Sequence, residues 1–278
     1  MKRKPIGKNT VRYQQIYPYT KLPVLANKYK SDMPKRARLF CPPFREGKET
    51  GFYLFPPVDF SFYLADDYMK MRFLKPEGSY FEVSVDRNSA IGADDLDRKV
   101  RLEQVSEQLY EDTSDYYFER LSAETRPFLE FYNYLFYLGR EEEPFDFWIL
   151  IYIGGLIETD PGNRIVVKHP SNVLTDHPFI VYDGIVESSK WPGTLNIGIK
   201  PLRKNEWIFV SRETPLCQVV GQNFEIKSLE VVESKKVDDD TFDWTLEWYF
   251  LNSKNYKKKP GQYQRDLGIE PKWKNWFK

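Results

Sequence analysis

The chain contains only two histidines, His169 and His177, and these decide what metal chemistry the sequence could support. Their number excludes a site of three histidines, so the remaining option joins both to a carboxylate from Asp176, Asp183 or Glu187. Two histidines and one carboxylate hold a divalent metal in non-haem iron enzymes, and we take Glu187 as the candidate third ligand. The close H-x-D/E spacing common in such sites is absent here, so structural or exposed loop histidines are the alternative.

The two cysteines, Cys41 and Cys217, form no disulfide framework and no C-x-x-C pair for zinc or redox chemistry. Cys217 lies in the apolar run TPLCQVV, where a thiol packs as a small hydrophobic group, and Cys41 has no base nearby in sequence. So few cysteines are typical of a reducing compartment. The N-terminal stretch MKRKPIGKNTVRYQQ lacks the apolar region of a secretory signal. We therefore expect a cytoplasmic protein.

No other pattern in the chain indicates catalysis. The paired acids Asp66-Asp67 and Asp94-Asp95 stand at turns or helix starts, where carboxylates ordinarily cap helices or face solvent. Phosphate-binding loops of the GxxxxGKS or GxGxxG kind are absent. The Gly154-Gly155 pair after ILIYI predicts a bulge or a tight strand crossing. The sequence leaves the enzyme question open and favours a protein without catalysis.

A polar turn between two apolar strands is the segment most suited to contact a ligand. It contains Asp183, and the run KWPG that follows contains Trp191. If a pocket opens at the mouth of a barrel, these two side chains are placed to line it. A plain hairpin connection is the alternative.

Short strands separated by turns dominate the sequence from Gly51 onward. SYFEVSVD alternates polar and apolar residues as a half-buried strand does, and further apolar runs from DFWILIYIGG to FEIKSLEVVE follow at short spacing. Parallel sheets would need helices between these strands. We therefore predict a mainly β (α+β) fold, an antiparallel β sandwich or barrel with an acidic helical insertion and a C-terminal helix.

The segments without strand patterns mark the expected domain boundaries. Residues 1–40 are basic and interrupted by prolines, which predicts an extended arm outside the core. Residues 41–253 are expected to form a single β-rich domain, and residues 94–139 its helical insertion, because apolar residues recur there at three- and four-residue spacings. The second helix of the insertion is expected to end at residue 138. Residues 254–278 form a basic aromatic tail.

Charge is unevenly distributed along the chain, although the formal net charge is zero. Residues 1–38 hold eleven Lys or Arg against one acid, residues 254–278 hold eight against two, and the middle is correspondingly acidic. Such asymmetry concerns association rather than fold. We interpret the basic ends as arms that lie on the acidic body of the same or a neighbouring subunit. Phosphate binding beside their tyrosines and tryptophans is the alternative.

The run YDGIVESSKWPGTLNIGIKPLRKNEWIFVSRETPLCQVVG resembles a β-rich family of unknown function found in bacterial and tailed-phage genomes. The resemblance is based on a G-[IV]-V-[ED] strand at residues 184–187, a turn with Trp or Pro, and a T-P-[IL]-x-Q strand at residues 214–218. A looser match places Cys41-Pro42 before the strand start Gly51-Phe52. The resemblance covers about half of the chain, implies a compact β fold and supplies no reaction. From its second motif we keep Gln218 as a candidate binding residue.

These observations favour a non-catalytic binding or assembly protein, which associates with itself or another protein through its charged arms and acidic helical insertion. The alternative is a cupin-like β-barrel metalloenzyme that binds a small molecule and a divalent metal. Nucleic-acid binding by the basic aromatic arms is a second alternative, and no nucleic-acid-binding motif supports it. The most apolar stretch, residues 145–157, is shorter than a membrane-spanning helix, so we expect no membrane contact.

Overall fold

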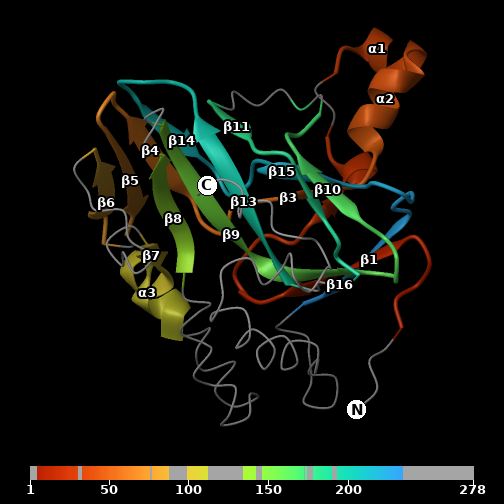
Figure 1. Cartoon of the computed structure of the whole chain (residues 1–278), viewed down its shortest axis with the longest axis horizontal. Coiled ribbons are helices and arrows are strands. Elements are labelled where there is room, and N and C mark those ends of the chain that lie inside the picture. The colour runs from red at the N-terminus through yellow and green to blue at the C-terminus, as the bar shows by residue number, and fades with distance from the viewer. Residues whose placement is uncertain are drawn as a thin grey trace, which may run out of the picture.

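The computed structural model of the chain describes residues 5–30, 33–75, 77–87, 99–111, 134–141, 146–171, 173, 178–189 and 193–233. These residues form three β-sheets around a continuous hydrophobic core, together with a few short helices (Figure 1). The prediction of a mainly β fold is confirmed. Of the two predicted architectures, the described residues adopt packed open sheets and do not close into a barrel.

The largest sheet has seven strands and is organised by one long strand, β9. One edge of β9 pairs along β13, whereas its other edge pairs first with β8 and then with β1. Gly154 lies between these two partners with a φ of 71°, opposite a register shift against β13, which confirms the predicted irregularity at this glycine pair. The strands are β1 (Thr10–Gln15), β7 (Lys99–Arg101), β8 (Tyr134–Glu141), β9 (Asp146–Thr159), β11 (Phe179–Val181), β13 (Gly193–Pro201) and β16 (Ser228–Val232).

The two smaller sheets are antiparallel throughout. The five-stranded sheet has the order β12-β10-β15-β3-β2, and the four-stranded sheet has the order β14-β4-β5-β6. The first contains β2 (Val24–Leu25), β3 (Phe52–Leu54), β10 (Ile165–Lys168), β12 (Gly184–Val186) and β15 (Cys217–Gly221). The second contains β4 (Phe60–Leu64), β5 (Tyr68–Leu74), β6 (Tyr80–Asp86) and β14 (Trp207–Val210).

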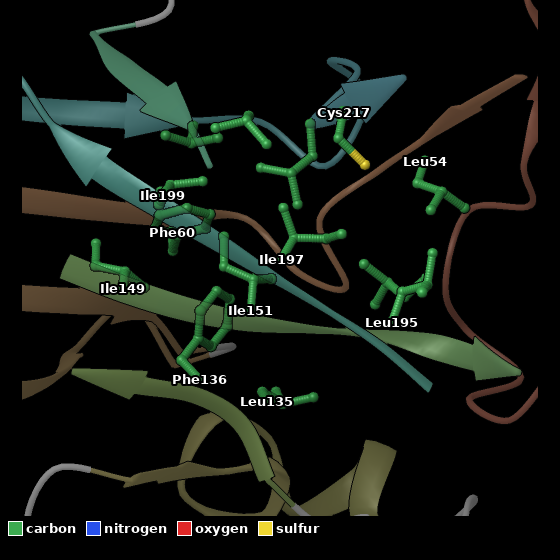
Figure 2. Packing of buried hydrophobic residues seen from close by; sticks show 14 of the residues in the cluster. Leu54, Phe60, Leu135, Phe136, Ile149, Ile151, Leu195, Ile197, Ile199 and Cys217 are labelled. Atoms are coloured by element: carbon green, nitrogen blue, oxygen red, sulfur yellow. The ribbon is translucent and has the colours of Figure 1, made fainter. Parts of the chain in front are cut away.

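Aromatic side chains join the four-stranded sheet to the seven-stranded one. The ring of Phe136 on β8 lies with its centroid 4.9 Å from that of Phe60 on β4 and 5.2 Å from that of Phe73 on β5. Figure 2 shows Phe60 and Phe136 close to Ile149 and Ile151 of β9. Burying such large rings stabilises the packing of the two sheets.

Two short helices project from the body at one corner of the molecule (Figure 1). They are α1 (Lys35–Phe40) and α2 (Pro42–Glu49), and they follow the 3-10 helix η1 (Ala26–Lys28). The far end of α2 is anchored by Lys48, whose buried ammonium donates hydrogen bonds to the carbonyls of Ala26, at 2.8 Å, and Tyr29. None of the described helices is long and apolar enough to cross a bilayer.

The prediction that residues 1–40 form an arm outside the core is wrong. Strand β1 lies inside the seven-stranded sheet, antiparallel to β9 and parallel to β16, and Tyr13 is 1 % exposed. Both faces of β1 are covered, so the polar residues Arg12, Gln14 and Gln15 are buried together with Val11 and Tyr13, which the sequence alone does not indicate. Its buried Arg12 is compensated by Glu158 of β9 and Glu230 of β16, at 3.6 and 3.3 Å.

The prediction of a helical insertion over residues 94–139 is wrong for residues 99–101 and 134–139, which form strands. Residues 99–101 form β7 and residues 134–141 form β8. Among the residues of this segment that the structure describes, helix is found in α3 (Leu102–Val105) and at residues 107–111. An apolar run such as FYNYLFYL fits either a helix or a buried strand, and pairing with β9 decides for the strand. The expected C-terminal helix and the tail at residues 254–278 lie outside the described residues, as does the middle of the insertion.

Candidate binding face

The four-stranded sheet buries one face in the core and turns the other to solvent. Successive side chains of a strand point to opposite faces, so Phe60 and Phe62 of β4 are buried while the residues that follow them, Ser61 and Tyr63, point outward. The same alternation holds on the other three strands. The outward side chains are Ser61, Tyr63, Tyr68, Lys70, Arg72, Leu74, Tyr80, Glu82, Ser84, Asp86, Trp207 and Phe209, and we call this surface the aromatic face.

A row of rings occupies one end of the aromatic face. Tyr63 lies directly opposite Trp207 in the pairing of β4 with β14, and their ring centroids are 5.6 Å apart. On its other side Tyr63 stacks on Tyr68, with centroids 5.9 Å apart and planes inclined by 15°. Partial loss of water contact raises the pKa of the Tyr63 hydroxyl, and the neighbouring Tyr68 hydroxyl raises it further. Such cross-strand ring pairs stabilise the sheet itself.

Arg72 lies across the middle of the aromatic face. Its Cζ atom is 4.0 Å from the ring centroid of Trp207 on β14 and 4.7 Å from that of Tyr80 on β6. Between Arg72 and Trp207 runs β4, where the register partner of Arg72 is the small Ser61. The guanidinium and the two rings therefore form a continuous layer from one edge strand to the other, held by cation–π contacts.

Neighbouring charges leave Arg72 without an ionic partner. Glu82 is its register partner on β6, but the Glu82 carboxylate accepts a hydrogen bond of 2.9 Å from Lys70 instead. That bond raises the pKa of Lys70. Within the described part of the chain, Arg72 makes no hydrogen bond or ion pair, and its Nε atom is buried without one. The face thus contains one uncompensated cation fixed between aromatic rings.

Large apolar side chains of the aromatic face are open to water. Tyr80 of the Arg72 layer is 55 % exposed, and two further apolar side chains of this face are also exposed, Phe209 at 65 % and Leu74 at 64 %. Exposed aromatic and arginine side chains on a rigid sheet suit recognition, because few rotamers are lost on binding.

The structure brings the predicted metal ligand His169 close to Asp183 but not to Glu187. His169 follows the end of β10, where burial lowers its pKa and the charge of Asp183 partly opposes that effect. Glu187 lies beside the start of β10 and accepts a hydrogen bond of 2.6 Å from Arg164 Nε. The two candidates are thus separated by the length of β10, roughly 16 Å at 3.3 Å per residue.

His177, the other predicted ligand, lies outside the described residues, as does Trp191 of the predicted binding turn. Among the residues that the structure describes, no three His, Cys, Asp or Glu side chains are grouped so that they could hold a metal ion. The proposed divalent-metal site therefore has no assembled set of ligands in this part of the chain.

The side-chain amide of Gln218 has a structural role, because backbone groups use its hydrogen-bonding capacity. The side chain is fully buried; its Nε2 donates to the carbonyls of Gly47 at 3.1 Å and Thr50 at 2.6 Å, and its Oε1 accepts from the Ser171 amide at 3.0 Å. Both amide hydrogens and the amide oxygen are used, so little capacity remains for a ligand. Gln218 anchors the end of α2 to β15 and to the segment after β10.

The aromatic face was not among the sites predicted from sequence, although the sequence contains a signal for it. The outward positions of YMKMRFL and SYFEVSVD hold Lys70, Arg72, Tyr80 and Glu82. In EWIFVS, Trp207 and Phe209 are two residues apart and therefore belong to the same face of a strand. The apolar positions of an alternating strand indicate the core, whereas the polar and aromatic positions between them indicate which side chains the sheet exposes. Which outward residues meet depends on sheet order, which short-range patterns do not contain.

Comparison with known proteins assigns neither a family nor a function to the chain. The chain matches no protein-family model and no curated protein sequence. The resemblance to the bacterial and phage family therefore stays a prediction.

Proposed function

We propose that this protein is a non-catalytic binding protein that holds a partner protein on its aromatic face. The observation that supports this is the exposure of Phe209, Tyr80 and Leu74 on the outward face of one sheet. Water contact with such apolar side chains is unfavourable, and exposed apolar surface of this kind commonly serves association. Trp, Tyr and Arg are also the residues that contribute most to binding energy at protein interfaces.

The charge of the aromatic face favours a protein over a nucleic acid. Lys70 and Arg72 are balanced by Glu82 and Asp86, so the face is formally neutral. Binding to nucleic acid derives much of its affinity from several phosphate contacts at once, and this face offers one cation that is not already paired. The partner is another copy of this chain or a different protein, and the uneven charge along the sequence supports association of either kind.

The first test asks whether the protein binds itself through this face. Sedimentation velocity of the wild type over a range of concentrations is compared with the Phe209→Ser variant and with Ile185→Ser as a control. Ile185 is 56 % exposed on the five-stranded sheet, so it matches Phe209 in exposure but lies elsewhere. Self-association that is weakened by Phe209→Ser and unchanged by Ile185→Ser supports the proposal.

If the wild type is monomeric, a displayed library of random peptides is selected against it. The proposal expects peptides whose affinity falls at least about tenfold with Phe209→Ser, the loss of roughly 1.4 kcal/mol, and is unchanged with Ile185→Ser. A monomer that selects no peptide sensitive to Phe209 would refute the proposal. Tight binding of single-stranded DNA or RNA by the same face would assign it to nucleic acid instead.

A further inference from the structure

Arg72 is held in place before any ligand arrives. Its guanidinium lies between the rings of Trp207 and Tyr80, which removes most of the rotamer freedom that an exposed arginine has. Nε is the guanidinium nitrogen that is buried without a partner, and the terminal nitrogens have no acceptor among the described residues. The terminal N–H groups of an arginine form a fork, the geometry from which an oxyanion accepts two parallel hydrogen bonds, and those of Arg72 are not used by any other described residue.

The charges around Arg72 limit how many negative groups a ligand can bring. Glu82 is engaged by Lys70 at 2.9 Å yet still lies opposite Arg72 across the β5–β6 pair. Asp86 stands at the Tyr68 end of the same strand. A ligand with a single negative charge gains the Arg72 contact with little repulsion from these carboxylates, whereas a multiply charged phosphate meets both.

From these observations we infer that the partner presents one carboxylate to Arg72, flanked by apolar or aromatic groups that cover Phe209 and Leu74. This inference deepens the proposed function and rests on it. The ligand class is an Asp or Glu side chain, or a chain-terminal carboxylate, within a protein segment. Bringing the partner over the face shields the ion pair from water, which strengthens it.

Small probes test the inference without knowledge of the natural partner. N-acetyl-L-phenylalanine contains one ring and one carboxylate, its primary amide contains the same ring without the charge, and phenyl phosphate replaces the carboxylate by a phosphate. Each is titrated into the ¹⁵N-labelled full chain while the Arg72 Nε–Hε signal is followed by NMR. The signal is assigned by its loss in Arg72→Gln.

We expect the carboxylate to shift the Arg72 signal and to bind at least about fivefold more tightly than the amide, as a charge-assisted hydrogen bond implies. Arg72→Gln abolishes this preference, and Arg72→Lys reduces it, because lysine keeps the charge but loses the stacked fork. Arg164→Gln, directly before β10 of the five-stranded sheet, leaves the preference unchanged. Circular dichroism verifies that each variant is folded.

Two outcomes would overturn the inference, and they differ from failure of the proposed function. Equal affinity of acid and amide, both weakened by Phe209→Ser, would keep the aromatic face as a binding site but remove the carboxylate. Tighter binding of phenyl phosphate than of the carboxylate, dependent on Arg72, would replace a carboxylate ligand by a phosphorylated one. Insensitivity of every probe to Phe209 and Arg72 would overturn both the inference and the proposed function.

Discussion

Replacing Gln218 by methionine tests the structural role assigned to this buried amide. Methionine has a similar length and no hydrogen-bonding groups, so Gln218→Met removes three hydrogen bonds without opening a large cavity. A buried polar group left without a partner costs about 1–3 kcal/mol. The carbonyls of Gly47 and Thr50 and the amide of Ser171 are partly buried, so water replaces some of what is lost. We therefore expect the free energy of unfolding to fall by about 2–4 kcal/mol.

Urea denaturation followed by tryptophan fluorescence measures this change, with Gln222→Met as the matched control. Gln222 is exposed at the end of the same segment, and its replacement should change the free energy of unfolding by less than about 0.5 kcal/mol. Hydrogen exchange in Gln218→Met should increase most in α2, whose end loses its attachment. If both variants unfold at the wild-type urea midpoint, the bonds of Gln218 do not anchor α2, and a ligand-binding role for the side chain becomes the better explanation.

Three further predictions follow from buried groups. Burial raises the pKa of the Cys217 thiol, so a thiol reagent at pH 8 should label Cys41 alone, and mass spectrometry should find Cys217 modified only in urea; equal labelling of both in the native protein would contradict its burial. Burial also raises the pKa of Tyr13 above its ordinary value of 10.0. Its stabilising contribution should therefore be complete below pH 10 and decline above it, and Tyr13→Phe should flatten that decline in urea titrations at stepped pH; an unchanged slope would count against it. Finally, a Cβ atom at Gly139 would overlap the ring of Trp148, so Gly139→Ala should lower the free energy of unfolding by about 1–3 kcal/mol, and a wild-type urea midpoint would show that the ring moves aside freely.

The sequence predicted strands best where one face of a sheet meets water. SYFEVSVD alternates because β6 exposes Tyr80, Glu82 and Ser84 while Val85 is buried, and the prediction for this strand is confirmed. The same reasoning failed for β1, whose alternation is short and whose polar Arg12 and Gln14 are buried by neighbouring strands instead of facing water. It also failed for β8, where pairing with β9 overrides a helix-like spacing. Both errors have one physical cause, since burial by elements distant in sequence decides the structure of these strands and the local pattern does not contain those contacts.

The candidate site residues were chosen by residue type, and this is a second reason why the prediction and the structure differ. Histidine and glutamate suggested a metal, but the backbone direction of β10 places His169 and Glu187 at opposite ends of that strand. Gln218 was chosen from a motif, and its amide bonds to backbone groups of a helix far away in sequence. In both cases the role of a side chain depends on its neighbours, and the fold determines those neighbours.

The aromatic face also depends on contacts between segments that are far apart in the sequence. Strands β4, β5 and β6 follow one another along the chain and pair in that order, so Arg72 and Tyr80 meet through a local meander. Trp207 and Phe209 reach the face only because β14 adds to the edge of β4 from far along the sequence. A ligand that contacts both Arg72 and Phe209 therefore bridges a local and a long-range part of the fold. Its binding should stabilise the pairing of β14 with β4 as well as occupy the site, because a ligand favours the state to which it binds.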